Sequence, residues 1–324
     1  MSSTWLFKIL CFLFLLAWLV ILSGDFYFKE KFRSYTNSSS TRPLIIAHRG
    51  ASGEAPENTL AAIELALKQK ADMIEVDVFL SKDEHIVVIH DASVNRTTNG
   101  QGKVAALTLA QLKKLDAGSW FDAAFVGEKI PTLTEVLTAV QGKAQLLIEV
   151  KQSGRGIARK INTLITQHQA NDWCIVQSFD TQVIENLHKL KSPLRKHQLV
   201  VGNLPLFIPY HVNKRLSSGS LYQYTNVQSV NPMYWFTTQQ VIEKLHAQNQ
   251  QVIVWTVNQP KDMRRLMNMG VDGIITNYPG KARQVCTKRG LHYLIASTLL
   301  CYVQRLSETI ECLIRKHGNV LDKS

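Results

Sequence analysis

The stretch "DMIEVDVFLSKDEHIVVIHD" (residues 72–91) holds two apolar runs that are separated by only a few polar residues. A connection this short cannot join parallel neighbours in a sheet, so the two runs are predicted to form an antiparallel hairpin. The first run carries two carboxylates, Glu75 and Asp77, which are two residues apart and therefore lie on the same side of the strand. The hairpin returns to a second polar pair, His90 and Asp91.

On both sides of this hairpin, short apolar runs alternate with helix-period segments, which is typical of βα units around a parallel sheet. With the return run of the hairpin set aside, eight parallel strands remain. Eight strands close a (β/α)8 TIM barrel, an α/β fold whose active site lies at the C-terminal ends of the strands. The predicted strands span 43–48, 72–78, 145–151, 173–179, 197–202, 226–230, 251–257 and 272–276. The predicted helices span 58–69, 133–140, 156–168, 181–190, 238–249 and 260–270.

The connection from Asp91 to Lys143 is longer than one helix requires. We therefore expect a small inserted subdomain after the second strand, placed over the barrel mouth. In the first predicted helix, Leu60, Ile63 and Leu67 share one face, and either Asn58 or Thr59 can cap its start.

The N-terminus has a different composition. Residues 5–22 are apolar except for Lys8, and a helix of that length spans about 27 Å, close to the hydrocarbon core of a bilayer. We predict a single transmembrane anchor over 1–24, with a cleavable signal peptide as the alternative. Basic residues are more frequent after this segment than before it, which favours a cytosolic catalytic domain. The predicted divisions are an anchor (1–24), a linker (25–42), a barrel (43–285) and a helical tail (286–324).

The bulk composition narrows the partners. The formal net charge of +12 favours phosphates, nucleic acid or an anionic membrane surface. The basic residues are dispersed and no nucleic-acid recognition motif is present, so no nucleic-acid partner is expected, and no obligate protein partner is evident. The five cysteines are scattered without metal or disulfide spacing, which argues against a zinc site or a disulfide framework.

Three carboxylates fall near the ends of predicted barrel strands: Glu75, Asp77 and Glu149. Burying two acids on one strand without a cation is costly, because ionised groups lose their hydration. A site made only of oxygen ligands suits Mg²⁺ or Ca²⁺ better than zinc. The sequence therefore predicts a divalent metal site at the mouth.

Further polar side chains follow the same strands. Arg49 and Lys151 would add positive charge beside the metal, where a phosphate would be held. His48 and His90 can act as an acid–base pair, because imidazole titrates near neutral pH. The pattern does not say which histidine is the acid and which is the base.

Several motifs together resemble the glycerophosphodiester phosphodiesterase family. They are "AHRGASGEAPENT", "IEVDVFLSKDEHIVVIHD", "NRTTNGQGKV", "LDAGSWF", "IPTLTEVL", "IEVK", "VIVWTVN" and "GVDGIITNYP". The resemblance runs from about residue 43 to 282. It implies metal-dependent hydrolysis of glycerophosphodiesters to sn-glycerol 3-phosphate and an alcohol. The roles implied are metal binding by Glu75, Asp77 and Glu149, acid–base catalysis by His48 and His90, and phosphate contacts from Arg49 and Lys151. The resemblance further implies that Glu57 and Asn58 support the first loop and that Trp255 lines the alcohol-side pocket.

Alternatives remain open at this point. A lysophospholipase D would release lysophosphatidic acid, and the apolar segment 202–215, if it reaches a membrane surface, would admit such substrates. A phospholipase of the phosphatidylinositol-specific or sphingomyelinase D type is disfavoured by the "PENT" and "WTVN" motifs. A non-catalytic lipid-binding membrane protein is disfavoured by the complete set of acid–base and metal-binding residues.

Overall fold

The structure, a computed structural model, describes residues 42–201 and 224–287. Eight parallel strands form a closed barrel, because β1 pairs with both β9 and β2 at the two ends of the strand order. The predicted barrel is therefore confirmed. The strands are β1 (Leu44–Ala47), β2 (Met73–Leu80), β4 (Gln145–Val150), β5 (Cys174–Ser178), β6 (Arg195–Val200), β7 (Ser229–Pro232), β8 (Gln251–Val254) and β9 (Gly273–Thr276).

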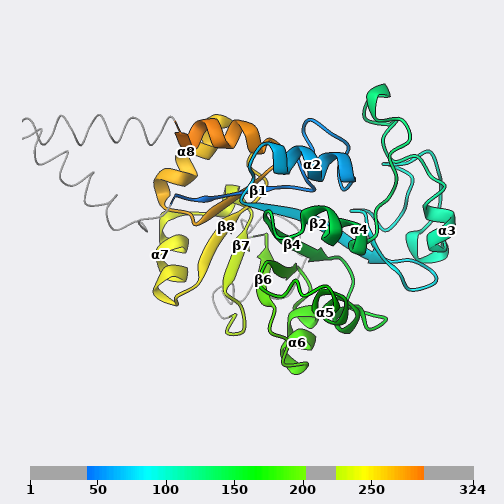
Figure 1. The fold of residues 1–324 in the computed structure, drawn as a ribbon. Helices are drawn as coiled ribbons and strands as arrows, with labels where there is room; N and C mark the ends of the chain where they lie inside the picture. The colour runs from blue at the N-terminus through cyan, green and yellow to red at the C-terminus, as the bar shows by residue number, and fades with distance from the viewer. Residues whose placement is uncertain (1–41, 202–223, 288–324) are drawn as a thin grey trace, which may run out of the picture.

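The predicted hairpin is also confirmed. Strand β3 (Ile86–Val88) runs antiparallel to the end of β2 and is not part of the barrel. The segment that follows lies beyond the carboxyl end of β2 (Figure 1) and has a small apolar core of its own. Its short elements are η1 (Val104–Ala106), α3 (Leu109–Leu112) and η2 (Ala123–Phe125).

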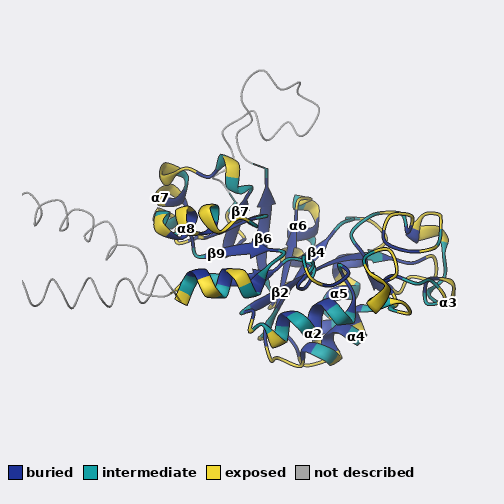
Figure 2. Cartoon of the chain, turned by 90° about the horizontal axis from the view of Figure 1, so that it is seen from above, coloured by how far each residue is buried: buried dark blue, intermediate teal, exposed yellow. Residues whose placement is uncertain are grey.

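Helices surround the barrel and bury one face each, as the exposed outer stripes in Figure 2 show. Each predicted helix is present, with ends that agree within two residues. Thr59 and Thr132 cap two of them through their hydroxyls, and Gly270 ends α8 in the left-handed region. The helices are α2 (Leu60–Lys68), α4 (Leu133–Val140), α5 (Ile157–Gln167), α6 (Thr181–Lys189), α7 (Gln239–Ala247) and α8 (Pro260–Met269).

Two strands differ from their predicted ranges by three residues at one end. The run over 251–257 ends earlier, because β8 stops at Val254, and the run over 226–230, expected to form the sixth barrel strand, is shifted, because β7 spans Ser229–Pro232. The polar Asn231 and the following proline end the apolar pattern at Val230, although the ladder with β6 continues through both. Asn231 is fully buried inside the barrel, where side-chain hydrogen bonds replace apolar contacts.

The barrel interior has two zones along its axis. The lower zone is an apolar plug of side chains from six strands, and the upper zone carries the charged residues of the mouth. The plug consists of Ile46, Met73, Leu147, Ile175, Ile253 and Ile275. This plug closes the barrel below the mouth, so access to the charged residues comes from the C-terminal ends of the strands.

Among the described residues, no helix is long and apolar enough to cross a membrane. The predicted anchor (1–24), the linker up to residue 41 and the apolar segment 202–215 lie outside the described residues. Residues 279–287 are helical and run across the predicted boundary between barrel and tail. The tail beyond residue 287 also lies outside the described residues.

Candidate active site

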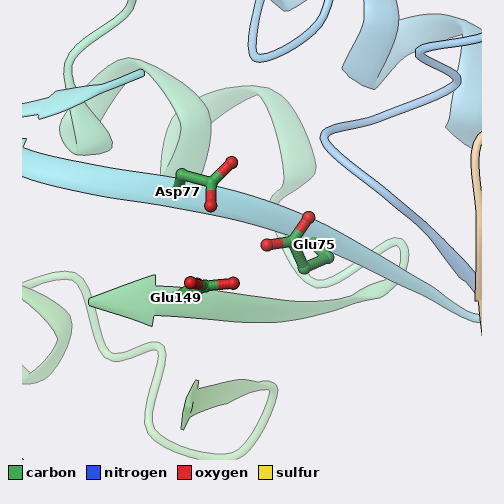
Figure 3. A group of neighbouring side chains, drawn as sticks. All are labelled: Glu75, Asp77 and Glu149. Carbon is green, nitrogen blue, oxygen red and sulfur yellow. The ribbon is translucent and has the colours of Figure 1, made fainter. Parts of the chain in front are cut away.

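Three buried carboxylates come together at the mouth of the barrel (Figure 3). Glu75 and Asp77 lie on β2 and Glu149 lies on β4, where parallel register places Asp77 directly opposite Glu149. One carboxylate oxygen from each lies within 4.8 Å of the others. The exposed fractions are 1% for Glu75, 0% for Asp77 and 7% for Glu149, so each acid has lost most of its contact with water.

The electrostatics of the three acids fit a cation. Burial raises the pKa of Glu75, and the charges of Asp77 and Glu149 raise it further. Burial, followed by the charge of Asp77, raises the pKa of Glu149 to about 7. Glu75 Oε1 and Asp77 Oδ1 are buried without a hydrogen-bond partner among the residues that the structure describes. Unpartnered carboxylate oxygens facing like charges are the donor set that a Mg²⁺ or Ca²⁺ ion would satisfy.

Two basic side chains partly neutralise the cluster. Lys151 Nζ lies 2.6 Å from Glu149 Oε1 and 3.4 Å from Asp77 Oδ1. Arg49 Nε lies 3.3 Å from Asp77 Oδ2, and the Arg49 backbone N–H donates to Glu75 Oε2 at 2.8 Å. Burial disfavours ionisation of Asp77, but Lys151 and Arg49 outweigh it and lower the pKa of that carboxyl. The predicted phosphate-binding cations therefore lie beside the acids.

The loop after β1 turns back sharply to place Arg49. Gly50 has φ of 80°, in the left-handed region, and a Cβ there would lie 2.6 Å from the carbonyl carbon of Ala62. Only glycine fits that close approach between the loop and α2. Gly50 also donates its N–H to the carbonyl of Glu75, which ties the loop to β2 next to the acids.

Asn58 braces the acidic cluster instead of capping the helix. Its Nδ2 donates to Asp77 Oδ2 at 2.9 Å, and its Oδ1 accepts from the Asp77 backbone N–H at 3.1 Å. The next residue, Thr59, is the helix cap, and its hydroxyl accepts from the Ala62 backbone N–H. Asn58 is 3% exposed, so its geometry suits the positioning of Asp77.

His48 is held by a residue that the sequence analysis did not single out. Its Nδ1 lies 2.7 Å from the side-chain oxygen of Asn277, which directly follows β9. An amide oxygen only accepts, so Nδ1 carries the proton and Nε2 keeps a lone pair. Desolvation in the mouth, with the charge of Arg49 adding to it, lowers the pKa of His48 to about 4. His48 is therefore neutral near pH 7, as a general base requires.

His90 has a carboxylate partner instead. Its Nδ1 lies 2.6 Å from Asp91 Oδ1. The hydrogen bond from Arg96 is the main cause that lowers the pKa of Asp91, and the hydrogen bond from His90 contributes. His90 in turn contributes to the lowered pKa of Asp77, and Asp77 acts electrostatically on His48. Both histidines thus belong to the same mouth as the acids.

Arg96 belongs to the motif "NRTTNGQGKV", and no role was predicted for it. It bridges Asp91 and Glu57, and Glu57 also accepts from Arg49 Nη1 at 2.8 Å. Asn277 directly follows the last barrel strand, so the strand-end rule would have found it. No sequence spacing indicates the partners of Arg96.

Trp255 lies on the apolar side of the mouth. Its indole N–H donates to the carbonyl of Asn231 at 2.8 Å, and its ring meets Phe179 edge-on with centroids 5.4 Å apart. Phe179 is 39% exposed, and Trp235, which follows β7, is 72% exposed. Large exposed aromatic side chains at a barrel mouth are suited to contact an apolar part of a ligand.

A family model described as the glycerophosphoryl diester phosphodiesterase family matches residues 48–281. The chain belongs to this family. As a member it is a glycerophosphodiester phosphodiesterase, a phosphoric diester hydrolase, and the predicted enzyme class is confirmed.

The matches between this phosphodiesterase and its relatives extend over nearly the whole length of the relatives. YhdW of Bacillus subtilis is 44% identical over 237 residues, which are 72% of this chain and 94% of that protein. A glycerophosphodiester phosphodiesterase of Caldanaerobacter subterraneus is 38% identical over 254 residues, which are 77% of this chain and 100% of that protein. A solved phosphodiesterase of Oleispira antarctica, in complex with the product sn-glycerol-3-phosphate, has a TM-score of 0.64 at 29% identity. That match covers 78% of this chain and 98% of the solved one.

Proposed function

We propose that this phosphodiesterase hydrolyses glycerophosphodiesters to sn-glycerol 3-phosphate and an alcohol, with a divalent cation held by Glu75, Asp77 and Glu149. The observation that carries the proposal is the group of three buried acids at the mouth, in which Glu75 and Asp77 each keep one oxygen without a hydrogen-bond partner among the described residues. The product complex of the Oleispira relative supports the choice of substrate class. The donor set favours Mg²⁺ or Ca²⁺.

Arg49 and Lys151 are proposed to hold the phosphate. When bound, the cation would neutralise charge on the non-bridging oxygens of the phosphodiester. Arg49 offers a planar guanidinium suited to two phosphate oxygens, and Lys151 adds a point charge beside the other oxygen of Asp77. Glu57 and Asn58 are proposed to support this loop, and Trp255 is proposed to line the pocket for the alcohol.

The two histidines are proposed to take different roles. His48 is the general base, because its Nε2 lone pair can accept a proton from the attacking water or from a neighbouring substrate hydroxyl. His90 is the general acid, because Asp91 Oδ1 holds its Nδ1 at 2.6 Å, and this contact leaves Nε2 to carry the proton for the leaving alcohol oxygen. General acid–base help of this kind contributes about 10²–10⁴-fold per group.

The direct test uses the purified full chain. Glycerophosphocholine and glycerophosphoinositol are incubated with Mg²⁺, Ca²⁺ or a chelator, and released glycerol 3-phosphate is measured beside the His90→Ala variant. We expect turnover that requires a divalent ion and is strongly reduced in the variant. Turnover that persists at the same rate in chelator would contradict the metal proposal, and no turnover of either substrate would contradict the proposed substrate class.

The roles of the histidines are tested by the leaving group. A glycerol 3-phosphate ester of p-nitrophenol has a leaving group that departs with little help from an acid. His90→Ala is therefore expected to lose much less rate on this ester than on glycerophosphocholine, whereas His48→Ala loses a similar factor on both. The reverse pattern would exchange the two assignments.

Lysophospholipids are the second candidate substrate class. The exposed Phe179, whose ring meets that of Trp255, and the exposed Trp235 after β7 favour it. With the predicted apolar N-terminal anchor, this would place the enzyme at a membrane surface. The catalytic domain is proposed to lie on the cytosolic side. Release of lysophosphatidic acid from lysophosphatidylcholine, measured with the same chain, tests the substrate. Labelling of residues on either side of the predicted anchor tests the location.

A further inference from the structure

Arg96 lies in the segment after the hairpin, and its guanidinium holds two carboxylates from different parts of the chain. Its Nε donates to Asp91 Oδ2 at 2.7 Å. Its Nη1 and Nη2 donate to the two carboxylate oxygens of Glu57 at 2.9 and 2.8 Å. One side chain thus joins the loop after β1 to the end of the hairpin.

Each carboxylate that Arg96 holds also holds a proposed active-site group. Asp91 Oδ1 lies 2.6 Å from Nδ1 of His90. Glu57 Oε1 lies 2.8 Å from Nη1 of Arg49. The acid–base histidine and the phosphate-binding arginine are therefore each separated from Arg96 by a single carboxylate.

We propose that Arg96 is a positioning residue for the phosphodiesterase reaction, which sets the proton donor His90 relative to the phosphate-binding Arg49 through Asp91 and Glu57. The inference rests on the proposed function for the roles of those two groups. It also gives the inserted segment a part in catalysis, because that segment supplies a side chain that touches both carboxylates.

The shape and charge of its guanidinium suit Arg96 to this role. Its planar fork matches the two oxygens of Glu57 while Nε is left for Asp91, and a lysine ammonium cannot make both contacts with this geometry. Without Arg96, Asp91 and Glu57 would face each other as like charges. Asp91, which is 30% exposed, would then be free to rotate away from His90. A displacement of about 1 Å in a catalytic group can cost on the order of 10²-fold in rate.

The alternative is an ordinary surface ion pair. Arg96 is 45% exposed, and an exposed pair typically contributes little to stability. Such a pair would leave the rate of the folded enzyme unchanged when it is removed. The two possibilities therefore differ in kinetics and not in the size of the stability change.

The experiment compares Arg96→Met and Arg96→Lys with a matched control. Arg155 bonds the backbone of Leu80 and Lys82 at the other end of the same hairpin and contacts none of the proposed site residues. We expect Arg96→Met to lower kcat for glycerophosphocholine about 10–100-fold with a smaller change in KM, and Arg96→Lys to recover only a small part. Arg155→Met should have the wild-type kcat when the rate is measured at a temperature at which the variant is folded.

Two readouts separate positioning from stability. The loss in Arg96→Met should be smaller for the p-nitrophenyl ester in the same sense as the loss in His90→Ala, because both variants impair the same proton donor. A crystal structure of Arg96→Met should show Asp91 and the His90 ring displaced. Equal kcat for Arg96→Met and Arg155→Met would overturn the inference, as would a leaving-group dependence unlike that of His90→Ala.

The failure of this inference is distinguishable from the failure of the proposed function. A wild-type chain that hydrolyses no glycerophosphodiester overturns the proposed function. In that case the crystal structure decides the positioning role by itself. Unmoved Asp91 and His90 in Arg96→Met overturn it, and displaced side chains support it.

Discussion

The lower and upper zones of the barrel interior come from the same strands and the same face, yet they differ completely in chemistry. On β2, Met73 is followed two residues later by Glu75, and on β4, Leu147 is followed by Glu149. Each pair is separated by roughly 6.6 Å along its strand. All four side chains are at most 7% exposed.

Burial alone does not reveal what a barrel residue does. In the lower zone, neutral side chains fill space and gain stability from leaving water. In the upper zone, the same degree of burial raises the pKa of Glu75 and Glu149. Ionisation of these two acids therefore costs free energy unless a cation binds beside them. The lower zone should therefore control stability, and the upper zone should control catalysis.

The largest effect is expected in the upper zone, from Glu149→Gln. The amide keeps the shape of Glu149 but removes a proposed metal ligand, so kcat/KM should fall by about 10³-fold or more, since a bound metal contributes several kcal/mol to transition-state stabilisation. Without divalent ions at pH 8, the melting temperature of the variant should not fall below that of the wild type, because the variant lacks a buried carboxylate that the charge of Asp77 disfavours. Steady-state kinetics and thermal unfolding check both statements. Near-normal activity would contradict the role of Glu149.

The matched change in the lower zone is Leu147→Ala, two residues earlier on the same strand. Removal of a fully buried leucine should lower the free energy of unfolding by about 2–5 kcal/mol, because it leaves a cavity in the plug. Urea unfolding measures this loss, and kcat of the folded variant should stay close to that of the wild type. A large drop in kcat without a loss of stability would break the comparison between the zones.

Asn58 and Thr59 allow a finer comparison, because they are adjacent but belong to different functions. Asn58→Ala removes both hydrogen bonds to Asp77, so the affinity for the divalent ion should fall about 10–100-fold. Thr59→Ala removes the cap of α2, and the free energy of unfolding should fall by about 1 kcal/mol with little change in metal affinity. Calorimetric titration with Mg²⁺ and Ca²⁺ distinguishes them. Equal metal affinities in the two variants would count against the bracing role.

The smallest effect is a dependence on pH. The folded state raises the pKa of Glu149 from 4.5 to about 7, so between these values it holds a proton that the unfolded chain has released. The stability of the chain without divalent ions should therefore fall as pH rises through this window, and Glu75 acts in the same direction. Asp77, whose pKa is lowered, acts in the opposite sense only at more acidic pH.

Metal should reverse this trend, because ligands bind a cation in their deprotonated form. The rise in melting temperature on addition of Mg²⁺ or Ca²⁺ should be larger at pH 8 than at pH 5. Thermal unfolding with and without ions measures it, and Glu149→Gln is the control in which the difference should shrink. A rise that is independent of pH would argue against a carboxylate metal site.

Much of the fold could be predicted because local pattern and geometry agree in this chain. The apolar runs ended at polar side chains, and the short turn before Ile86 required an antiparallel hairpin. The strand-end rule of barrels then placed the acids and His48 at one mouth. The apolar pattern missed the end of the sixth barrel strand, because Asn231 satisfies its polar atoms inside the barrel with Ser229 and with Gln177, which is 54 residues away.

The acids and His48 could be assigned to the mouth in advance, since side chains alternate along a strand and parallel strands end at one rim. How these residues act on each other depends on the folded chain. Asn277 is 229 residues from His48, and Arg96 reaches back 39 residues to Glu57. Such partners are chosen by barrel closure and by the path of the inserted segment. The protonation of the site depends on those contacts, because a pKa responds to burial and neighbouring charge, which spacing along the chain does not encode.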